Sequence, residues 1–106
     1  MARGIAYADD PETEYRVIIQ KFMKELCKRD DEDNRGRRDP DRPPNVFPTK
    51  QIQEEGLGAF SLEHVIFNLR RHLQENRDNE PFDFLDNEVN VRLTNAGRAR
   101  CDEYGL

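Results

Sequence analysis

The stretch Ser61–Arg77, SLEHVIFNLRRHLQENR, has the pattern of one long amphipathic helix, and the rest of the chain can be arranged around it. Apolar residues recur there at helical spacing and predict a core-facing side made of Leu62, Val65, Ile66, Leu69 and Leu73. Ser61 can cap the helix, and Glu63 places a negative charge near the positive end of the helix dipole. The predicted outer side carries groups that donate hydrogen bonds, stack or carry charge: His64, Phe67, Asn68, Arg71 and Gln74.

Two helices are predicted upstream of this stretch, after a loose arm at residues 1–9. Asp10 and Pro11 are an N-cap and a first helical residue, and they predict a helix that ends near Lys28. Its core-facing residues are Tyr15, Ile18, Ile19, Phe22, Met23 and Leu26. Thr49 is predicted to cap a short helix that Gly56 stops. A short helix, a tight turn and a longer helix follow the helix-turn-helix order.

The segment from Lys28 to Pro44 contains no apolar residue and predicts a flexible charged loop at about residues 28–45. Two interpretations of this loop remain open. Its arginines can form a mobile basic arm that reaches DNA phosphates, or the loop is a solvated insertion whose neighbouring acids cancel the positive field. The arginines concerned are Arg35, Arg37, Arg38 and Arg42. The following apolar pair, Val46 and Phe47, predicts a very short strand or a plug under the core.

Two alternating apolar runs follow the long helix and predict a β-hairpin with one apolar face. Phe82 and Phe84 belong to the first strand, Val89, Val91 and Leu93 belong to the second, and Asp86-Asn87 supplies the turn. Thr94 is predicted to cap a last helix at about residues 95–104. The expected fold is therefore α+β and mostly helical, with a single domain at residues 10–106.

Composition limits the classes of function. The chain has 106 residues and a formal net charge of −5, which argues against a generic polyanion binder because nonspecific nucleic-acid affinity comes from a basic surface. At molar salt, however, the Debye length falls to about 3 Å, so exposed charges are screened. Under those conditions the net charge of the chain would no longer argue against DNA binding. No apolar run is long enough to span a membrane, and we expect a cytoplasmic protein. The two cysteines, Cys27 and Cys101, are expected to be reduced thiols.

Nothing in the sequence indicates an enzyme, a metal site or a cofactor. His64 and His72 are eight residues apart on the predicted long helix, or about 12 Å along its axis, which is too far to share a metal ion. No catalytic or phosphate-binding motif occurs, and the carboxylates lie in charge runs without an apolar pocket that would shift their pKa values.

The segment Val91–Arg100, VRLTNAGRAR, resembles the strand-to-helix junction of bacterial and archaeal winged-helix regulators, where a wing strand ends in Leu-Thr and a helix with an early glycine follows. The matching positions are Leu93, Thr94, Gly97 and Arg98. The resemblance implies a winged helix-turn-helix fold with a three-helix core, a β-hairpin wing and a short C-terminal helix. It also implies that the long helix enters the major groove of DNA. The residues then expected to contact DNA are Thr49, Lys50, Ser61, His64, Phe67, Asn68, Arg70, Arg71, Gln74 and Arg92.

Two functions follow from this resemblance. The first is a small transcriptional regulator that binds double-stranded DNA, acting as a homodimer on a two-fold site. The second is a winged-helix module that binds a protein partner, because the predicted wing carries Asp83, Asp86 and Glu88 against only Arg92 and would repel phosphate. In that case the acidic wing and the outer helix face, including Phe67, form the contact surface.

Overall fold

A computed structural model describes residues 10–37 and 40–105, and these form a mostly helical α+β structure, as expected. In chain order the elements are α1 (Pro11–Asn34), β1 (Val46–Pro48), α2 (Thr49–Gly56), α3 (Leu62–Glu75), β2 (Phe82–Leu85), β3 (Asn90–Leu93), α4 (Asn95–Arg98) and the 3-10 helix η2 (Cys101–Tyr104). The predicted arm at residues 1–9 and Arg38 lie outside the described residues.

Helix α1 is the longest element and begins where the sequence indicates. The Asp10 side chain accepts a hydrogen bond from the Glu12 amide at 3.1 Å, and Pro11 is the first helical residue. The six apolar residues predicted to face the core are all buried. The predicted end near Lys28 is wrong, because the helix continues to Asn34 through the charged run.

Two buried aspartates explain this extension of α1. Asp30 and Asp33 follow Cys27 at helical spacing, so they continue its buried stripe although they are charged. The Asp30 carboxylate accepts hydrogen bonds from Arg98 at 2.8 and 3.1 Å and from the Asn45 side chain at 2.7 Å. The Asp33 carboxylate accepts from Arg42 at 2.6 and 3.0 Å. Paired carboxylates can be buried, so the stripe does not need to remain apolar.

The three strands form one antiparallel sheet in the order β1-β3-β2. The pairing of the two predicted strands is confirmed, with Phe82 opposite Leu93 and Phe84 opposite Val91, but the placement of Val89 in the second strand is wrong, because β3 begins at Asn90 and Val89 lies exposed in the turn. The short strand predicted at Val46 and Phe47 is also confirmed, and it pairs with β3 from the other side. Phe82, Val91 and Phe47 are buried, so one face of the sheet packs on the core.

Helices α2 and α3 are joined by a tight turn whose apolar residues, Leu57 and Phe60, are buried. The Gln53 side chain donates a hydrogen bond to the Phe60 carbonyl at 2.7 Å and so links α2 to this turn. Ser61 caps α3 as predicted, since its hydroxyl accepts from the His64 amide at 3.2 Å. Thr49 does not cap α2: the N-cap is Pro48, and Thr49 is the first helical residue and is buried.

The C-terminal segment is not one helix from 95 to 104 as predicted. Thr94 caps α4, with its hydroxyl 3.0 Å from the Gly97 amide, but α4 ends at Arg98 and the chain turns before η2 begins. Gly97 lies so close to Pro81 that an added Cβ would be 1.9 Å from the Pro81 carbonyl oxygen. Close approach of two backbone segments therefore explains the glycine at this position.

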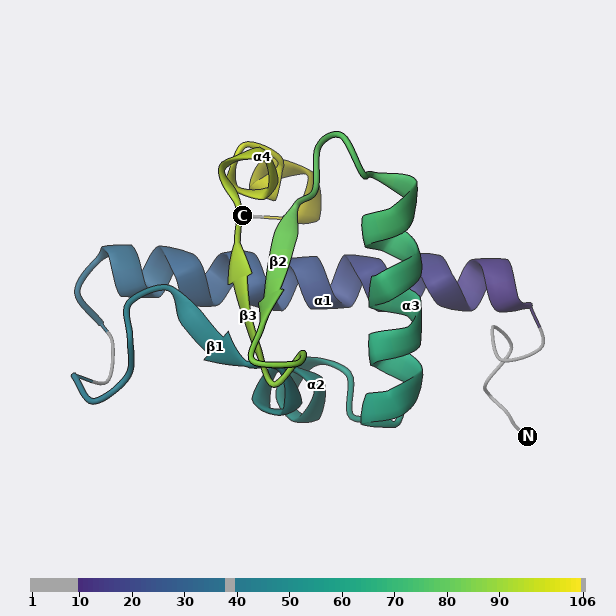
Figure 1. The fold of residues 1–106 in the computed structure, drawn as a ribbon, viewed down its shortest axis with the longest axis horizontal. Helices are drawn as coiled ribbons and strands as arrows, with labels where there is room; N and C mark the ends of the chain where they lie inside the picture. The colour runs from purple at the N-terminus through teal and green to yellow at the C-terminus, as the bar shows by residue number, and fades with distance from the viewer. Residues whose placement is uncertain (1–9, 38–39, 106) are drawn as a thin grey trace.

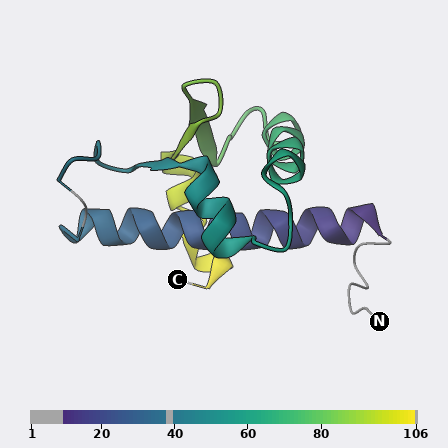
Figure 2. The ribbon, with the colours of Figure 1, turned by 90° about the horizontal axis from the view of Figure 1, so that it is seen from below.

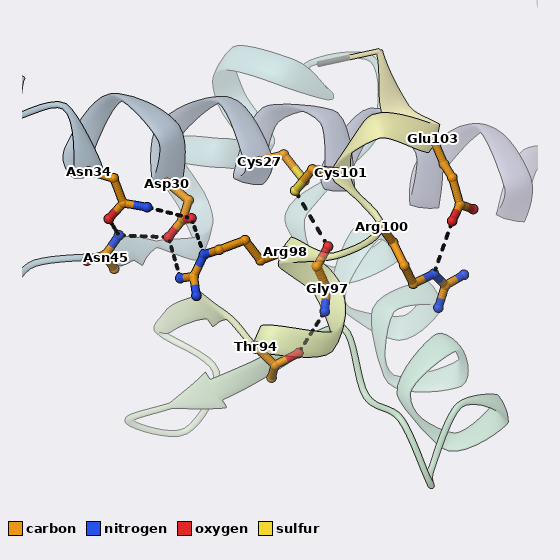
Figure 3. Close-up of a disulfide and its surroundings, with 10 residues drawn as sticks. All are labelled: Cys27, Asp30, Asn34, Asn45, Thr94, Gly97, Arg98, Arg100, Cys101 and Glu103. Atoms are coloured by element: carbon orange, nitrogen blue, oxygen red, sulfur yellow. Dashed lines mark hydrogen bonds and ion pairs between the residues drawn. A yellow bond between two sulfur atoms is a disulfide. The ribbon is translucent and has the colours of Figure 1, made fainter.

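The expectation of two reduced cysteines is wrong, because Cys27 of α1 and Cys101 of η2 form a disulfide (Figure 3). The two residues are 74 positions apart in the sequence and lie in no short cysteine motif. The two cysteines meet because the C-terminal segment packs against α1. Their spacing in the sequence does not indicate this contact.

Helix α1 separates two parts of the molecule. In Figure 1 it runs behind the sheet, and α3 crosses it beside β2. Figure 2 shows α3 and the β2–β3 hairpin on one side of α1, while the C-terminal end of the chain lies on the other side. The core is thus built on α1, which leaves one side of α3 exposed.

Candidate nucleic-acid interface

The exposed side of α3 is a stripe formed by Glu63, Phe67, Arg70 and Gln74, and this set is called the α3 stripe below. The buried side contains Val65, Asn68, Leu69 and His72. Compared with the prediction, the helix is rotated about its axis by roughly a sixth of a turn, at 100° per residue. Phe67 and Gln74 therefore face outward as predicted, whereas the predicted outward position of Asn68 is wrong.

Hydrogen bonding explains how Asn68 can be buried. Its side-chain amide donates to the His64 carbonyl one turn earlier at 2.9 Å, which satisfies part of its hydrogen-bonding capacity within the helix. Leu62, Ile66 and Leu73, which were predicted to define the core face, flank the buried side and are only partly buried. Asn68 is thus not positioned to contact a base edge in this arrangement.

Arg70 is the cation of the α3 stripe, and it pairs with Glu88 in the β2–β3 turn. The Nε atom lies 2.6 Å from Oε2 of Glu88, and an NH2 group contacts the other carboxylate oxygen, so the pair is bidentate. The Arg70 side chain nevertheless remains 61% exposed. Hydrogen bonding to Arg70 lowers the pKa of Glu88, which keeps the carboxylate charged.

The turn that carries Glu88 has an unusual backbone. Asp86, Asn87 and Glu88 all have positive φ angles, of 52°, 56° and 73°. Non-glycine residues adopt this left-handed region at a cost, which is small for Asp and Asn and larger for Glu. Hydrogen bonds hold the turn, including one from the Thr49 amide to the Val89 carbonyl at 2.9 Å. The β2–β3 turn is therefore fixed against the start of α2, close to α3.

Arg71 has a different environment from Arg70 and joins α3 to α1. Its guanidinium lies over the Tyr15 ring at 3.9 Å and donates to Glu12 at 2.8 and 2.9 Å and to Glu75 at 2.9 Å. The hydrogen bonds from Arg71 and Tyr15 together lower the pKa of Glu75. The side chain is engaged from three directions, which indicates a structural role in packing the two helices.

The remaining predicted DNA contacts are scattered. His64 is partly buried and pairs with Glu14 of α1. Lys50 and Ser61 are exposed at the starts of α2 and α3, whereas Thr49 is buried and its hydroxyl has no hydrogen-bond partner. Arg92 lies on β3, 3.3 Å from Asp83 of β2. The structure thus brings Phe67, Arg70 and Gln74 together on one side of α3. The other exposed residues of the predicted set lie apart: Lys50 and Ser61 at helix N-termini, and Arg92 on β3.

A buried polar pair lies at the other end of α3. The Tyr15 hydroxyl is 2.8 Å from Nδ1 of His72 and 3.1 Å from Glu75, while Nε2 of His72 has no hydrogen-bond partner. Burial, together with the Glu75 carboxylate, raises the pKa of Tyr15 to about 12. Burial, together with the positive charge of Arg100, lowers the pKa of His72. Both groups are therefore neutral near pH 7.

Sequence reasoning missed the acidic partners of α3. Glu12 and Glu14 were noted only as residues near the positive end of the α1 dipole, yet they also bind Arg71 and His64. Glu12 lies 59 residues before Arg71 and Glu14 lies 50 residues before His64, so the local sequence does not indicate these contacts. Glu88 was recognised as an acid on the wing, but its contact with Arg70 depends on how the hairpin folds against α3.

No protein-family model matches the chain, and comparisons with curated proteins and with solved structures find no match either. Across residues 10–37 and 40–105, no helix has the length and apolar character needed to cross a membrane. Within the same residues, no group of three or more histidine, cysteine, aspartate or glutamate side chains is arranged to hold a metal ion.

Proposed function

We propose that this chain is a winged-helix protein that binds duplex DNA and regulates transcription, with α3 in the major groove and the β2–β3 hairpin as the wing. One observation carries the proposal: a short helix, a tight turn and α3 are followed by a hairpin whose second strand pairs with β1, and one side of α3 remains exposed. This order of helices, with a small antiparallel sheet, supports the winged-helix proposal. Two copies on a two-fold site would follow the usual symmetry of such regulators.

The α3 stripe has suitable dimensions for groove binding. Fourteen helical residues span about 21 Å, and a helix fits into a major groove about 12 Å wide. Arg70 can donate two hydrogen bonds to guanine or contact a phosphate, and Gln74 can pair with adenine. Lys50, exposed at the start of α2, can contact the phosphate backbone.

The ion pair between Arg70 and Glu88 does not prevent this role. The arginine is largely exposed, and exposed pairs contribute only about 0–1 kcal/mol, so a phosphate or a guanine can replace Glu88 as its partner. Arg71 would lose contacts with Glu12, Glu75 and Tyr15 at the same time, so its release costs more. We therefore assign DNA contact to Arg70 and a structural role to Arg71.

The test is the affinity of the purified protein for duplex DNA across a salt series from about 50 mM upward. Each phosphate contact adds about 0.9 to the slope of log affinity against log salt. If Arg70 contacts a phosphate, Arg70→Ala should weaken binding and reduce the slope by about 0.9. The control is Lys24→Ala, because Lys24 is an exposed cation beside Gly105, and the C-terminal end of the chain lies across α1 from α3 (Figure 2).

Two results would contradict the proposal. Absence of wild-type binding at the lowest salt would exclude duplex DNA as the ligand. Equal losses for Arg70→Ala and Lys24→Ala would mean that the affinity is nonspecific and that α3 is not the contacting helix.

A protein-binding module is the second candidate, and the exposed apolar residues favour it. Phe67 is 64% exposed and Val89 is 62% exposed, and they are the large hydrophobic residues exposed in the described part of the chain. Phe67 lies one turn before Arg70, and Val89 directly follows Glu88, so both accompany the same ion pair. Exposed apolar side chains bordered by polar and charged residues are typical of protein interaction sites.

The protein-binding candidate makes its own prediction for Phe67→Ala. In the protein-binding interpretation, the wild type does not bind DNA, and the substitution abolishes association with the partner. Lys24→Ala should again have no effect. Retained association in the Phe67→Ala, Val89→Ala double variant would remove this surface from consideration.

A further inference from the structure

The disulfide between Cys27 and Cys101 lies in a surface hollow of about 420 Å³. Both cysteines line the hollow, together with residues of α1 and of the C-terminal segment that include Asp31, Arg35, Arg98 and Asp102. Cys27 is 1% exposed and belongs to the hydrophobic core, whereas Cys101 is partly exposed. Cys101 is therefore the more exposed of the two cysteine residues.

We propose that this hollow is a thiol-exchange site, at which a small thiol attacks the sulfur of Cys101 and opens the disulfide. In the first step the attacking thiolate forms a bond to Cys101 Sγ, the bond between the two protein sulfurs breaks, and Cys27 leaves as a thiolate that takes up a proton. A second small thiolate then attacks the small-thiol sulfur of the mixed disulfide, the bond from that sulfur to Cys101 Sγ breaks, and Cys101 leaves as a thiolate that takes up a proton while the small-molecule disulfide is released. Two small thiols are oxidised and one protein disulfide is reduced, so electrons and protons balance.

The direction of attack follows from exposure. Nucleophilic attack on a disulfide requires access to one sulfur, and Cys101 is the more exposed residue of the pair, whereas Cys27 belongs to the buried core. The mixed disulfide is accordingly expected on Cys101.

The charges around the hollow favour a cationic thiol. Arg98 bonds to the Asp30 carboxylate, and Arg35 lies 3.0 Å from Asp31, so these charges are paired (Figure 3 shows the first pair). Asp102 adds a carboxylate for which no ion pair is found among the described residues. An aminothiol such as cysteamine should therefore react faster, for an equal thiolate concentration, than an anionic thiol of similar size.

Opening the disulfide should release η2 and leave α4 in place. Among the described residues, no hydrogen bond or ion pair joins Cys101–Tyr104 to α1, so the disulfide is the directional link between them. The partly buried Tyr104 ring adds only apolar packing against the core. Helix α4, in contrast, remains attached through Arg98 and Asp30 and through the Thr94 cap.

The first experiment measures the rate at which the oxidised full-length protein loses its disulfide in native buffer, with cysteamine as the probe and 2-mercaptoethanesulfonate as the anionic comparison. The rate should rise in proportion to thiol concentration, and the rate with cysteamine relative to that with 2-mercaptoethanesulfonate should fall by about threefold or more when salt is raised from low to molar concentration. A rate that levels off with thiol concentration would mean that the protein must unfold first, and would overturn the proposal.

A matched pair of variants locates the reacting sulfur. With cystamine as the probe, Cys27→Ser should form a mixed disulfide on Cys101 in native buffer, and mass spectrometry detects the adduct. Cys101→Ser, whose remaining thiol is buried, should form none. Adduct in Cys101→Ser but not in Cys27→Ser would overturn the assignment of Cys101.

Hydrogen exchange provides a readout that does not depend on variants. In the reduced wild type, amides of residues 101–105 should exchange faster than in the oxidised protein, while the Gly97 amide of α4 should be unchanged. Equal protection of residues 101–105 in both forms would show that the disulfide does not hold η2.

Discussion

His72 illustrates how one buried side chain can set the pH dependence of stability. Its imidazole is neutral in the folded protein because burial and the nearby Arg100 lower its pKa below the ordinary value of 6.5. In the imidazolium both ring nitrogens carry a proton, and Nε2 lies in a buried position without a hydrogen-bond partner. In the unfolded chain the same ring titrates normally, so the unfolded state binds more protons between the two pKa values.

We therefore expect the free energy of unfolding to fall as pH decreases from about 7 to about 5, by at most about 1.4 kcal/mol per pH unit for one proton. The sign follows from linkage: stability rises with pH wherever the unfolded state binds more protons. Chemical denaturation across this range measures it. Glu75, whose pKa is lowered from 4.5, loses its contribution only at lower pH.

The variant His72→Asn keeps a polar side chain but cannot titrate, so its stability should be nearly flat over the same range. His64→Asn is the matched control, because His64 lies on the same helix but is 42% exposed at its side chain. This control should retain the decline seen in the wild type. An equal decline in His72→Asn and the wild type would contradict the assignment.

His72 and Asn68 also show why the outward side of α3 could not be predicted from residue type alone. A pattern of apolar residues assigns polar side chains to solvent, yet both residues are buried. Asn68 bonds to its own helix, and His72 bonds to Tyr15, which is 57 residues away in the sequence. The helix and its Ser61 cap depend on local sequence and were predictable, whereas its rotation depends on distant hydrogen-bond partners.

At the scale of elements, the β2–β3 turn competes with DNA for Arg70. Glu88 neutralises the cation of the α3 stripe, so removing its charge should free Arg70 and reduce repulsion of phosphate. We expect Glu88→Gln to increase DNA affinity by about threefold to tenfold at low salt, with a steeper salt dependence. The measurement is the same titration used for Arg70→Ala.

Asp83→Asn is the matched control for this change. Asp83 also lies on the hairpin and pairs with an arginine, but its partner is Arg92 of β3 and not a residue of α3. Asp83→Asn removes one negative charge, as Glu88→Gln does, so an effect of net charge alone on DNA affinity appears in both variants. A gain in affinity no larger for Glu88→Gln than for Asp83→Asn would exclude specific competition.

The junction between β3 and α4 makes a separate prediction about stability. An added Cβ at Gly97 would overlap the Pro81 carbonyl, and backbone cannot move as easily as a flexible side chain. Gly97→Ala should therefore lower the free energy of unfolding by about 3 kcal/mol, near the upper end of overpacking costs. Gly36→Ala is the comparison, since an added Cβ there meets no atom within 4 Å, and its positive φ of 78° limits the cost to about 1 kcal/mol. Equal costs would contradict the steric explanation.

The elements themselves were predictable to different degrees. The caps at Asp10, Ser61 and Thr94 and the pairing of β2 with β3 depend on neighbouring residues, and all were predicted correctly. The end of α1 was not, because Asp30 is buried only when Asn45 and Arg98 reach it from other parts of the chain. The charged run was interpreted as a solvated segment. That interpretation is wrong for Asp30 and Asp33, which are buried and hydrogen-bonded to residues outside α1.

For the whole molecule, the disulfide should be a major contributor to stability. It closes a loop of 74 residues, and restricting the unfolded chain in this way contributes about 4 kcal/mol by the chain-entropy estimate. The double variant Cys27→Ala, Cys101→Ala should be less stable than the oxidised wild type by an amount of this order. Chemical denaturation of both proteins measures the difference.

The reduced wild type is the control, and its stability should be close to that of the double variant. A difference below about 1 kcal/mol between oxidised and reduced protein would contradict the estimate. The pairing itself could not be predicted, because it joins a helix near the start of the chain to a 3-10 helix near its end.

The position of α1 in the core has a consequence for how the protein is made. Its apolar side is covered by α3, by the sheet and finally by η2, all of which come later in the sequence. During translation, at about 5–20 residues per second, α1 emerges seconds before its partners and cannot bury Ile18, Phe22 or Leu26. In proteins most of the stability of an amphipathic helix comes from packing of its apolar face, and α1 lacks that packing at this stage. A chain still being synthesised is therefore expected to expose the apolar side of α1 until the later segments that cover it have emerged.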